Sequence, residues 1–186
     1  AAIASTLVER GELEGARKAY LEVIEVGRRL GNERDVAIAL QNLAWVDRDS
    51  GEVIAARRHV AEAMGMQERR GEELDLVFSL DCAGVMALEQ DDTDAAEKLF
   101  QRALVLREKL KMKKVATLQN LAEVRLVERR LDEAKEVIGR SLAAATAGGL
   151  DEGFAREVEL RILIEARDLP GAARALARSR ELSGER

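Results

Sequence analysis

Apolar residues recur along this chain at helical spacing, in paired segments separated by short breaks that contain glycine or aspartate. The segment 13–30 carries Ala16, Tyr20 and Val23 on one face, and later segments repeat this arrangement. A spacing of three and four residues is typical of an amphipathic helix. Further helices are expected at 3–10, 35–49, 53–70, 75–90, 93–110 and 154–166, with others from Leu131 and from Leu169 onward.

The helices form a repeat. The pentapeptide Leu-Gln-Asn-Leu-Ala occurs at 40–44 and again at 118–122. The first small residue of each return helix recurs after 40, 40, 38 and 38 residues, at Ala16, Ala56, Ala96, Ala134 and Ala172. One helical hairpin cannot bury both of its faces, so neighbouring hairpins stack. We therefore predict an all-α fold, an α-solenoid with a right-handed superhelix of about five antiparallel hairpins. The approximate units are 1–32, 33–72, 73–113, 114–150 and 151–186.

The breaks predict the helix ends. Gly11, Gly31 and Gly71 follow the last apolar position of a helix, where a left-handed residue is common. Asp35 and Asp75, 40 residues apart, are expected to cap the helices that follow them.

Composition agrees with a helical fold and excludes several functional classes. Charged residues make up 35% of the chain, aromatic residues only 3%, and there is one proline. A net charge of −5 gives no electrostatic footprint for nucleic acid, and no apolar run is long enough to cross a membrane. Cys82 is the only cysteine, which fits a reducing, cytoplasmic location. We expect no cofactor, no metal, no direct contact with nucleic acid and no membrane partner.

The chain opens Ala1-Ala2-Ile3, without methionine and already in a helical pattern. We expect 1–186 to be a single repeat domain that belongs to a longer protein.

The repeat has a characteristic set of small and large apolar residues. A first helix bears a large residue, then a leucine or alanine and a small residue, and the return helix bears alanine, a large apolar residue and a small one. These positions are Leu40, Leu43, Ala44, Ala56, Val60 and Ala63; Leu80, Ala83, Gly84, Ala96, Phe100 and Ala103; and Leu118, Leu121, Ala122, Ala134, Ile138 and Ser141. The pattern resembles the tetratricopeptide repeat family. Its long period resembles the subclass found in kinesin light chains and in C-terminal regions of bacterial regulators. The family's aromatic residue near the end of the first helix is absent, since Asp47, Ala87 and Arg125 stand there.

The resemblance implies a partner-binding surface, because the first helices of this family line a concave face. Carried onto this chain, that face holds Ile38, Gln41, Asn42, Trp45 and Asp49; Phe78, Asp81, Cys82, Val85 and Glu89; and Gln119, Asn120, Glu123 and Val127. The side-chain amides are expected to hydrogen-bond a peptide or a helix end; alternatively they only face water. Trp45 and Phe78 form either an exposed anchor pair or part of the core between repeats.

Other residues carry weaker predictions. A clamp for a C-terminal carboxylate is disfavoured because Ile38, Phe78 and Ala116 stand where cations would be needed. His59, the only histidine, is expected on a solvated face, and Cys82 is expected to be a packing residue. The sequence has no phosphate loop, nucleophile elbow or zinc-binding helix, so an enzyme is not expected.

These observations favour a non-catalytic interaction module that binds a protein, as a peptide or a helix, in its groove within a regulatory or signalling protein. Two alternatives stay open. One is a homodimerisation module that uses the same groove or an uncapped end. The other is a ligand or peptide sensor domain of a transcriptional regulator.

Overall fold

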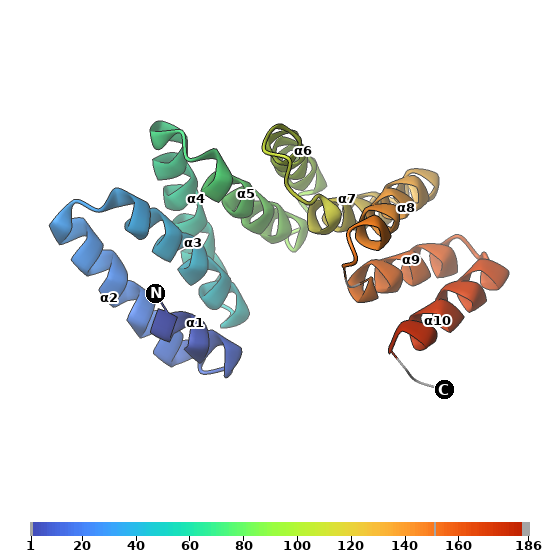
Figure 1. Ribbon diagram of the computed structural model, residues 1–186, viewed down its shortest axis with the longest axis horizontal. Helices are drawn as coiled ribbons and strands as arrows, with labels where there is room; N and C mark the ends of the chain where they lie inside the picture. Colours follow the sequence, from blue (N-terminus) through green and yellow to red (C-terminus); the bar gives the residue numbers. More distant parts are fainter. Residues whose placement is uncertain (1, 151, 184–186) are drawn as a thin grey trace. The chain divides into compact units, whose positions relative to one another are not determined.

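The computed structural model describes residues 2–150 and 152–183, and every regular element in them is an α-helix (Figure 1). This confirms the predicted fold class of antiparallel helical hairpins. The helices are α1 (Ala2–Glu9), α2 (Leu13–Leu30), α3 (Glu33–Asp49), α4 (Val53–Arg70), α5 (Glu73–Leu88), α6 (Thr93–Lys109), α7 (Val115–Val127), α8 (Leu131–Ala147), α9 (Gly153–Glu165) and α10 (Leu169–Ser183).

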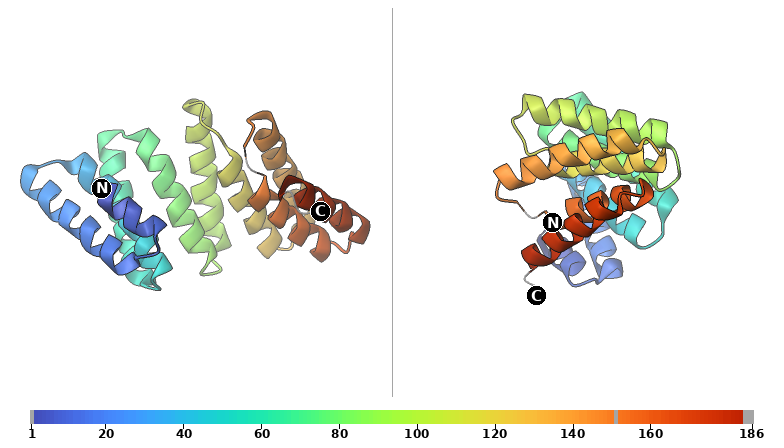
Figure 2. Two further views of the ribbon diagram at one scale, coloured as in Figure 1. Left: turned by 60° about the horizontal axis from the view of Figure 1, so that its bottom comes forward. Right: turned by 90° about the vertical axis from the view of Figure 1, so that its right-hand side faces the viewer.

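The chain divides into two compact units, Ala1–Asp92 and Thr93–Arg186. In unit 1, each of the helices α1 to α5 packs against the next, and α3 also contacts α5 (Figure 2). In unit 2, helices α6 to α10 pack in the same sequential way, and α7 also contacts α9. The first helices α3 and α5 in unit 1, and α7 and α9 in unit 2, therefore lie side by side.

The helix ends follow the glycine pattern but not the predicted aspartate caps. Gly31 ends α2 with a φ of 68°, as expected for a left-handed terminal residue. The amide of Asn32 then bonds back to the Gly27 carbonyl at 2.9 Å, and α3 restarts at once. The cap is therefore Asn32, whose side chain accepts the Asp35 amide. The prediction that Asp35 caps this helix is wrong, because the tight turn leaves no room for two further linker residues. Asp75 likewise lies inside α5.

The core of unit 1 consists of two apolar clusters. One includes Tyr20 and Ile24 of α2 with Leu40 and Leu43 of α3. The other lies between α3, α4 and α5 and includes Ala44, Ala56, Val60, Cys82 and Met86. The core of unit 2 includes Ala122, Ala134, Ile138, Val158 and Ile162. The leucines and alanines of both pentapeptides are buried, because the small residues let neighbouring helices approach closely.

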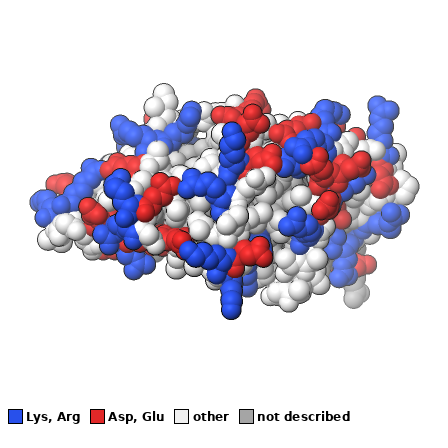
Figure 3. Space-filling model, turned by 90° about the horizontal axis from the view of Figure 1, so that it is seen from above, with Lys and Arg blue, Asp and Glu red and all other residues white. Residues whose placement is uncertain are grey.

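Charged side chains of both signs are mixed over the surface. On the face shown in Figure 3, Lys and Arg alternate with Asp and Glu rather than forming an area of one sign. Several pair between helices, such as Arg28 with Glu62 at 2.7 Å and Arg129 with Glu165 at 3.0 Å. Exposed pairs of this kind each contribute only about 0 to 1 kcal/mol. These ion pairs therefore contribute little to the stability of the fold.

Candidate functional site

Most of the predicted partner-binding residues lie where α3 and α5 run side by side in unit 1. We call this surface the α3–α5 face. It comprises Ile38, Asn42, Trp45, Arg48 and Asp49 on α3, Phe78, Asp81 and Val85 on α5, and Glu89 directly after α5. The Phe78 side chain is 43% exposed, Ile38, Trp45 and Val85 are half-buried, and Asp81 is buried.

Arg48 connects the charged and aromatic residues of this face. Its guanidinium carbon lies 5.0 Å from the centroid of the Trp45 ring, which is within the range of a cation–π contact. Arg48 Nε also donates to Glu89 Oε1 at 2.9 Å, and Nη1 lies 3.5 Å from Asp49 Oδ1. Arg48 was not among the site residues predicted from the sequence. Its signal was the i,i+3 spacing from Trp45, which puts both on one side of a helix.

Trp45 agrees in part with each of the two predictions that the sequence left open, an exposed anchor and a core residue. Its ring packs against the cluster of Ala44, Val60 and Met86, yet it is only half-buried. Phe78, in contrast, is exposed. The face therefore combines one ring fixed by the core with one that reaches solvent.

Cys82 lies beneath this face and is a packing residue, as predicted. It is fully buried in the cluster shared by α3, α4 and α5. Burial raises the pKa of its thiol to about 12, although the nearby Arg48 acts in the opposite direction. A thiol held in its neutral form is a poor nucleophile and a poor metal ligand.

The two amides of the first pentapeptide have different environments. Gln41 Oε1 accepts hydrogen bonds from Gln67 Nε2 at 3.2 Å and from Ser79 Oγ at 3.0 Å. These bonds connect α3 to α4 and α5, so a partner can reach only the Gln41 amide nitrogen. Asn42 is half-buried at the surface of α3.

The second pentapeptide lies in unit 2, and its glutamine is more enclosed than Gln41. Gln119 is buried, with 7% of its surface exposed, and Asn120 is half-buried. Glu123 pairs with Arg161 of α9 at 2.5 Å. Burial raises the pKa of Glu123, while Arg161 acts to lower it. Val127, in contrast, is exposed.

A buried ion-pair network occupies the position in unit 1 where the family carries an aromatic residue. Asp47 is completely buried. Its Oδ1 accepts from Arg17 Nε at 2.9 Å, and its Oδ2 lies 2.7 Å from His59 Nδ1, which must therefore carry the proton that it donates. The prediction that His59 faces solvent is wrong, because Asp47 provides an acceptor inside the hairpin.

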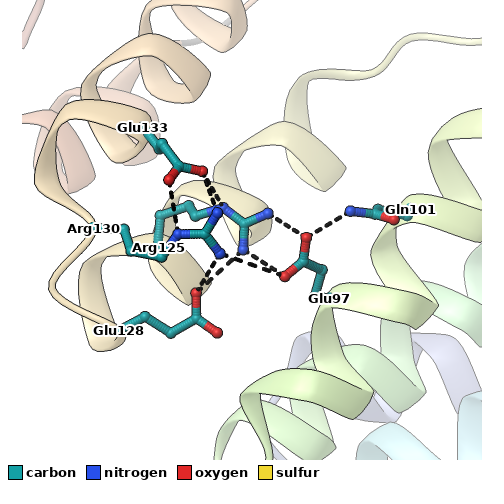
Figure 4. Close-up of polar contacts among 6 residues, drawn as sticks. All are labelled: Glu97, Gln101, Arg125, Glu128, Arg130 and Glu133. Atoms are coloured by element: carbon teal, nitrogen blue, oxygen red, sulfur yellow. Dashed lines mark hydrogen bonds and ion pairs between the residues drawn. The ribbon is translucent and has the colours of Figure 1, made fainter.

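Unit 2 has a related network of opposite polarity around Arg125, which stands 78 residues after Asp47. Arg125 is buried and binds both carboxylate oxygens of Glu97 of α6, and it also pairs with Glu128 and Glu133 at 3.3 Å each (Figure 4). The hydrogen bond from Arg125 lowers the pKa of Glu97. Glu97 holds the repeat position of Arg17, so acid and base have exchanged places between the two networks. The only signal in the sequence was a charge within an apolar stripe.

Two kinds of site are not found in the described part of the chain, a metal site and a membrane-spanning helix. Within residues 2–150 and 152–183, no three His, Cys, Asp or Glu side chains gather as a metal site requires. No helix in this part of the chain has the length and hydropathy of a membrane span.

Comparison with known proteins identifies the repeat. A sequence model of the tetratricopeptide repeat matches residues 79–110, from α5 into α6. The resemblance drawn from the apolar positions is thereby confirmed. No curated protein matches this chain.

Solved structures with tetratricopeptide-like repeats share the fold of the chain. The nearly identical TPR-like repeats of a candidate kinesin light chain from Podosopora anserina are 14% identical, with a TM-score of 0.75 over 98% of this chain and 92% of that one. BtubC (BKLC) from P. vanneervenii is 16% identical, with a TM-score of 0.84 over 97% of this chain and 77% of that one. At such low identity the likeness shows the fold alone.

Proposed function

We propose that the α3–α5 face binds a peptide or a helix of another protein, and that the chain is the non-catalytic recognition module of a cytoplasmic regulatory or signalling protein. Tetratricopeptide repeats are generally scaffolds for protein–protein interaction, and the matched repeat includes most of α5. Nucleic acid and membranes are not among the proposed partners, in keeping with the net charge of −5.

One observation carries this proposal: exposed Phe78 shares a face with Trp45, which Arg48 already covers. Aromatic and arginine side chains contribute most of the energy at protein interfaces. Because the Trp45 ring packs against the core and Arg48 is held by Glu89 and Asp49, little conformational entropy remains to be lost on binding.

The charges on this face define the partner. Asp49 and Glu89 are about half exposed, with 49% and 44% of their side chains accessible, and both pair with Arg48 alone among the contacts shown. An apolar partner residue can pack on Phe78 while a lysine or arginine farther along the partner pairs with these carboxylates, because Glu89 follows Phe78 by roughly 16 Å along the axis of α5. We therefore propose a partner with an apolar anchor and, several residues away, a cation. In unit 2, the involvement of Gln119, Asn120 and Glu123 in binding a partner stays a prediction.

A random peptide library displayed on phage tests the proposal. Selection on the chain should enrich peptides with an apolar residue and, several residues away, Lys or Arg. Fluorescence anisotropy should then show that Phe78→Asp weakens their binding by at least about tenfold, because it puts a charge under the apolar anchor. Val105→Asp, which alters an exposed valine of α6 in unit 2, is the matched control and should change nothing. If the enriched peptides bind Phe78→Asp as tightly as the natural chain, this face is not the recognition surface.

A further inference from the structure

A charged pocket with a volume of about 350 Å³ lies between α9 and α10 in unit 2. The charged residues that line it are Arg156, Glu159, Asp168, Arg174 and Arg178. Leu163 and Ala175 add apolar surface to the lining. The pocket therefore combines an excess of positive charge with a small apolar area.

The repeat explains why this space is open. Because α10 begins 116 residues after α4, Leu163 and Ala175 hold the repeat positions of Asp47 and His59. In unit 1, Asp47 and His59 are both buried and joined by a hydrogen bond of 2.7 Å. Alanine is much smaller than histidine, and leucine has no carboxylate. The pocket therefore has room where unit 1 has an imidazole, and it lacks the anion that unit 1 has at Asp47.

The lining positions are those that face the preceding return helix in unit 1. Arg156 and Glu159 correspond to Leu40 and Leu43. Leu40 and Leu43 pack in one cluster with Tyr20 of α2, the return helix of the hairpin before them. The pocket is therefore on the side of its hairpin that faces back along the chain.

A following hairpin uses other positions. In unit 1, Ala44 and Val60 share a cluster with Cys82 of α5, the first helix of the next hairpin. Their counterparts on α9 and α10 are Leu160 and Leu176, and neither of these two residues lines the pocket. The pocket is therefore not the surface on which another repeat would stack.

The two carboxylates of the pocket already have partners. Glu159 Oε2 accepts a hydrogen bond from Arg156 Nη1 at 2.8 Å. Asp168 Oδ1 accepts one from the backbone amide of Gly171 at 2.9 Å, in the first turn of α10, where a negative charge is favourable. Neither carboxylate therefore needs a cationic ligand.

Two arginines of the pocket have donors to offer a ligand. Arg174 and Arg178 are one turn apart on α10, so they lie on the same side of the helix. Arg178 pairs with Glu181 at 3.0 Å, but both side chains are more than half exposed, and such pairs are weak. No carboxylate of the residues that the structure describes forms an ion pair with Arg174. The unmet charge of the pocket is therefore positive.

We propose that this pocket binds a small organic anion, with its carboxylate or phosphate group on Arg174 and Arg178 and its apolar part against Leu163 and Ala175. A guanidinium group offers paired donors that match the geometry of either anionic group. The volume of the pocket is in the range of small-molecule sites. The pocket shares no residue with the α3–α5 face, so this proposal does not depend on the function proposed for that face.

Isothermal titration calorimetry with benzoate and with phenyl phosphate tests the proposal, since the two probes join different anionic groups to the same ring. We expect at least one of them to bind the natural chain saturably, with a Kd below about 1 mM. The tighter of the two identifies the anionic group that the pocket prefers. Benzyl alcohol, which has the ring without the charge, should not bind in this range.

Arg174→Gln should weaken this binding at least about tenfold, because it removes charge-assisted hydrogen bonds to the anion. Arg174 is exposed, so the variant should fold, which circular dichroism verifies. Arg129→Gln is the matched control and should change nothing, since the Arg129 side chain is 72% exposed on α7 and lies outside the pocket.

Three results would overturn the proposal. The first is that neither anion binds saturably in this range. The second is that benzyl alcohol binds as tightly as the anions, which would leave only an apolar contact. The third is that Arg174→Gln binds as tightly as the natural chain or no more weakly than Arg129→Gln, because net charge alone would then explain the binding.

Discussion

At the scale of single residues, the helices around a charged side chain decide whether it is buried and which ion pairs it forms. Asp47 and Asp49 are two positions apart on α3, yet Asp47 is completely buried and Asp49 is half exposed. Asp47 is held by Arg17 and His59, whereas Asp49 contacts only the partly exposed Arg48 in the ion pairs shown. A buried charge whose partner is removed is costly, while an exposed pair contributes little.

We therefore predict that Asp47→Ala lowers the free energy of unfolding by about 2 to 3 kcal/mol, because His59 loses its acceptor and the Arg17 guanidinium its buried carboxylate. Urea denaturation followed by circular dichroism measures this change. The control is Asp49→Ala, for which we expect a loss below about 1 kcal/mol. Equal losses for the two variants would show that the Asp47 network does not stabilise unit 1.

The Cys82 thiol should be protected from alkylation in the folded protein. With a pKa of about 12, roughly one thiol in ten thousand is ionised at pH 8. Iodoacetamide should therefore react with the native chain at least about a thousandfold more slowly than with the chain in urea. Mass spectrometry of timed samples gives both rates. Rapid labelling of the native chain would contradict the burial of this thiol.

The same thiol should make stability fall at high pH. Its pKa rises on folding, from an ordinary value of 9.0 to about 12. Between these values the unfolded chain has lost the proton and the native chain keeps it, so the free energy of unfolding falls as pH rises, by up to about 1.4 kcal/mol per pH unit. The variant Cys82→Ala should lack this part of the pH dependence when both proteins are denatured in urea across that range.

At the scale of helices, the α2–α3 hairpin depends on a close approach at Gly27. A Cβ atom added there would lie 2.7 Å from Val36 Cγ2, and the β-branched valine has little freedom to move aside. Gly139 of α8 provides a contrast: a Cβ there would meet nothing within 4 Å in the described part of the chain. The two glycines lie in regular helices, so only their surroundings differ.

We predict opposite effects of alanine at these two glycines. Gly139→Ala should raise the free energy of unfolding by up to about 1 kcal/mol through helix propensity. Gly27→Ala should lower it by about 1 kcal/mol, because overpacking against Val36 outweighs the same gain. Thermal unfolding of both variants tests the difference. A stabilised Gly27→Ala would mean that α2 and α3 can separate at no cost.

The Glu97–Arg125 pair should couple α6 to α7. A double-mutant cycle with Glu97→Gln and Arg125→Met should give an interaction energy of about 1 to 3 kcal/mol. The exposed pair Arg129–Glu165 should give less than about 1 kcal/mol. Because Arg125 lowers the pKa of Glu97, this stabilisation is present above the unfolded carboxyl pKa of roughly 4.3 and is lost as pH falls through the folded value. Coupling that is unchanged by acid would contradict an ionic origin.

At the scale of the whole molecule, the chain is built from two compact units, and unit 1 holds the α3–α5 face. This surface uses first helices of successive hairpins, which the repeat places side by side. It therefore arises from stacking, since each hairpin has more apolar surface than it can bury alone.

The sequence by itself determined the helices, their period and their glycine turns, because these depend on local spacing and backbone preference. Leu13–Leu30 and Val53–Arg70 were predicted to the residue. It also identified the resemblance to the tetratricopeptide repeat, because the small residues at Ala56, Ala96 and Ala134 recur wherever two helices approach.

Only the tertiary structure decided which polar side chains are used inside the fold. His59 faces Asp47, the Gln41 oxygen is taken by Gln67 and Ser79, and Arg125 is enclosed by glutamates. Most of these contacts join different helices, and helical periodicity gives no information on what the neighbouring helix presents. For the same reason the sequence could not decide between Trp45 and Phe78, of which the core holds one ring and leaves the other exposed.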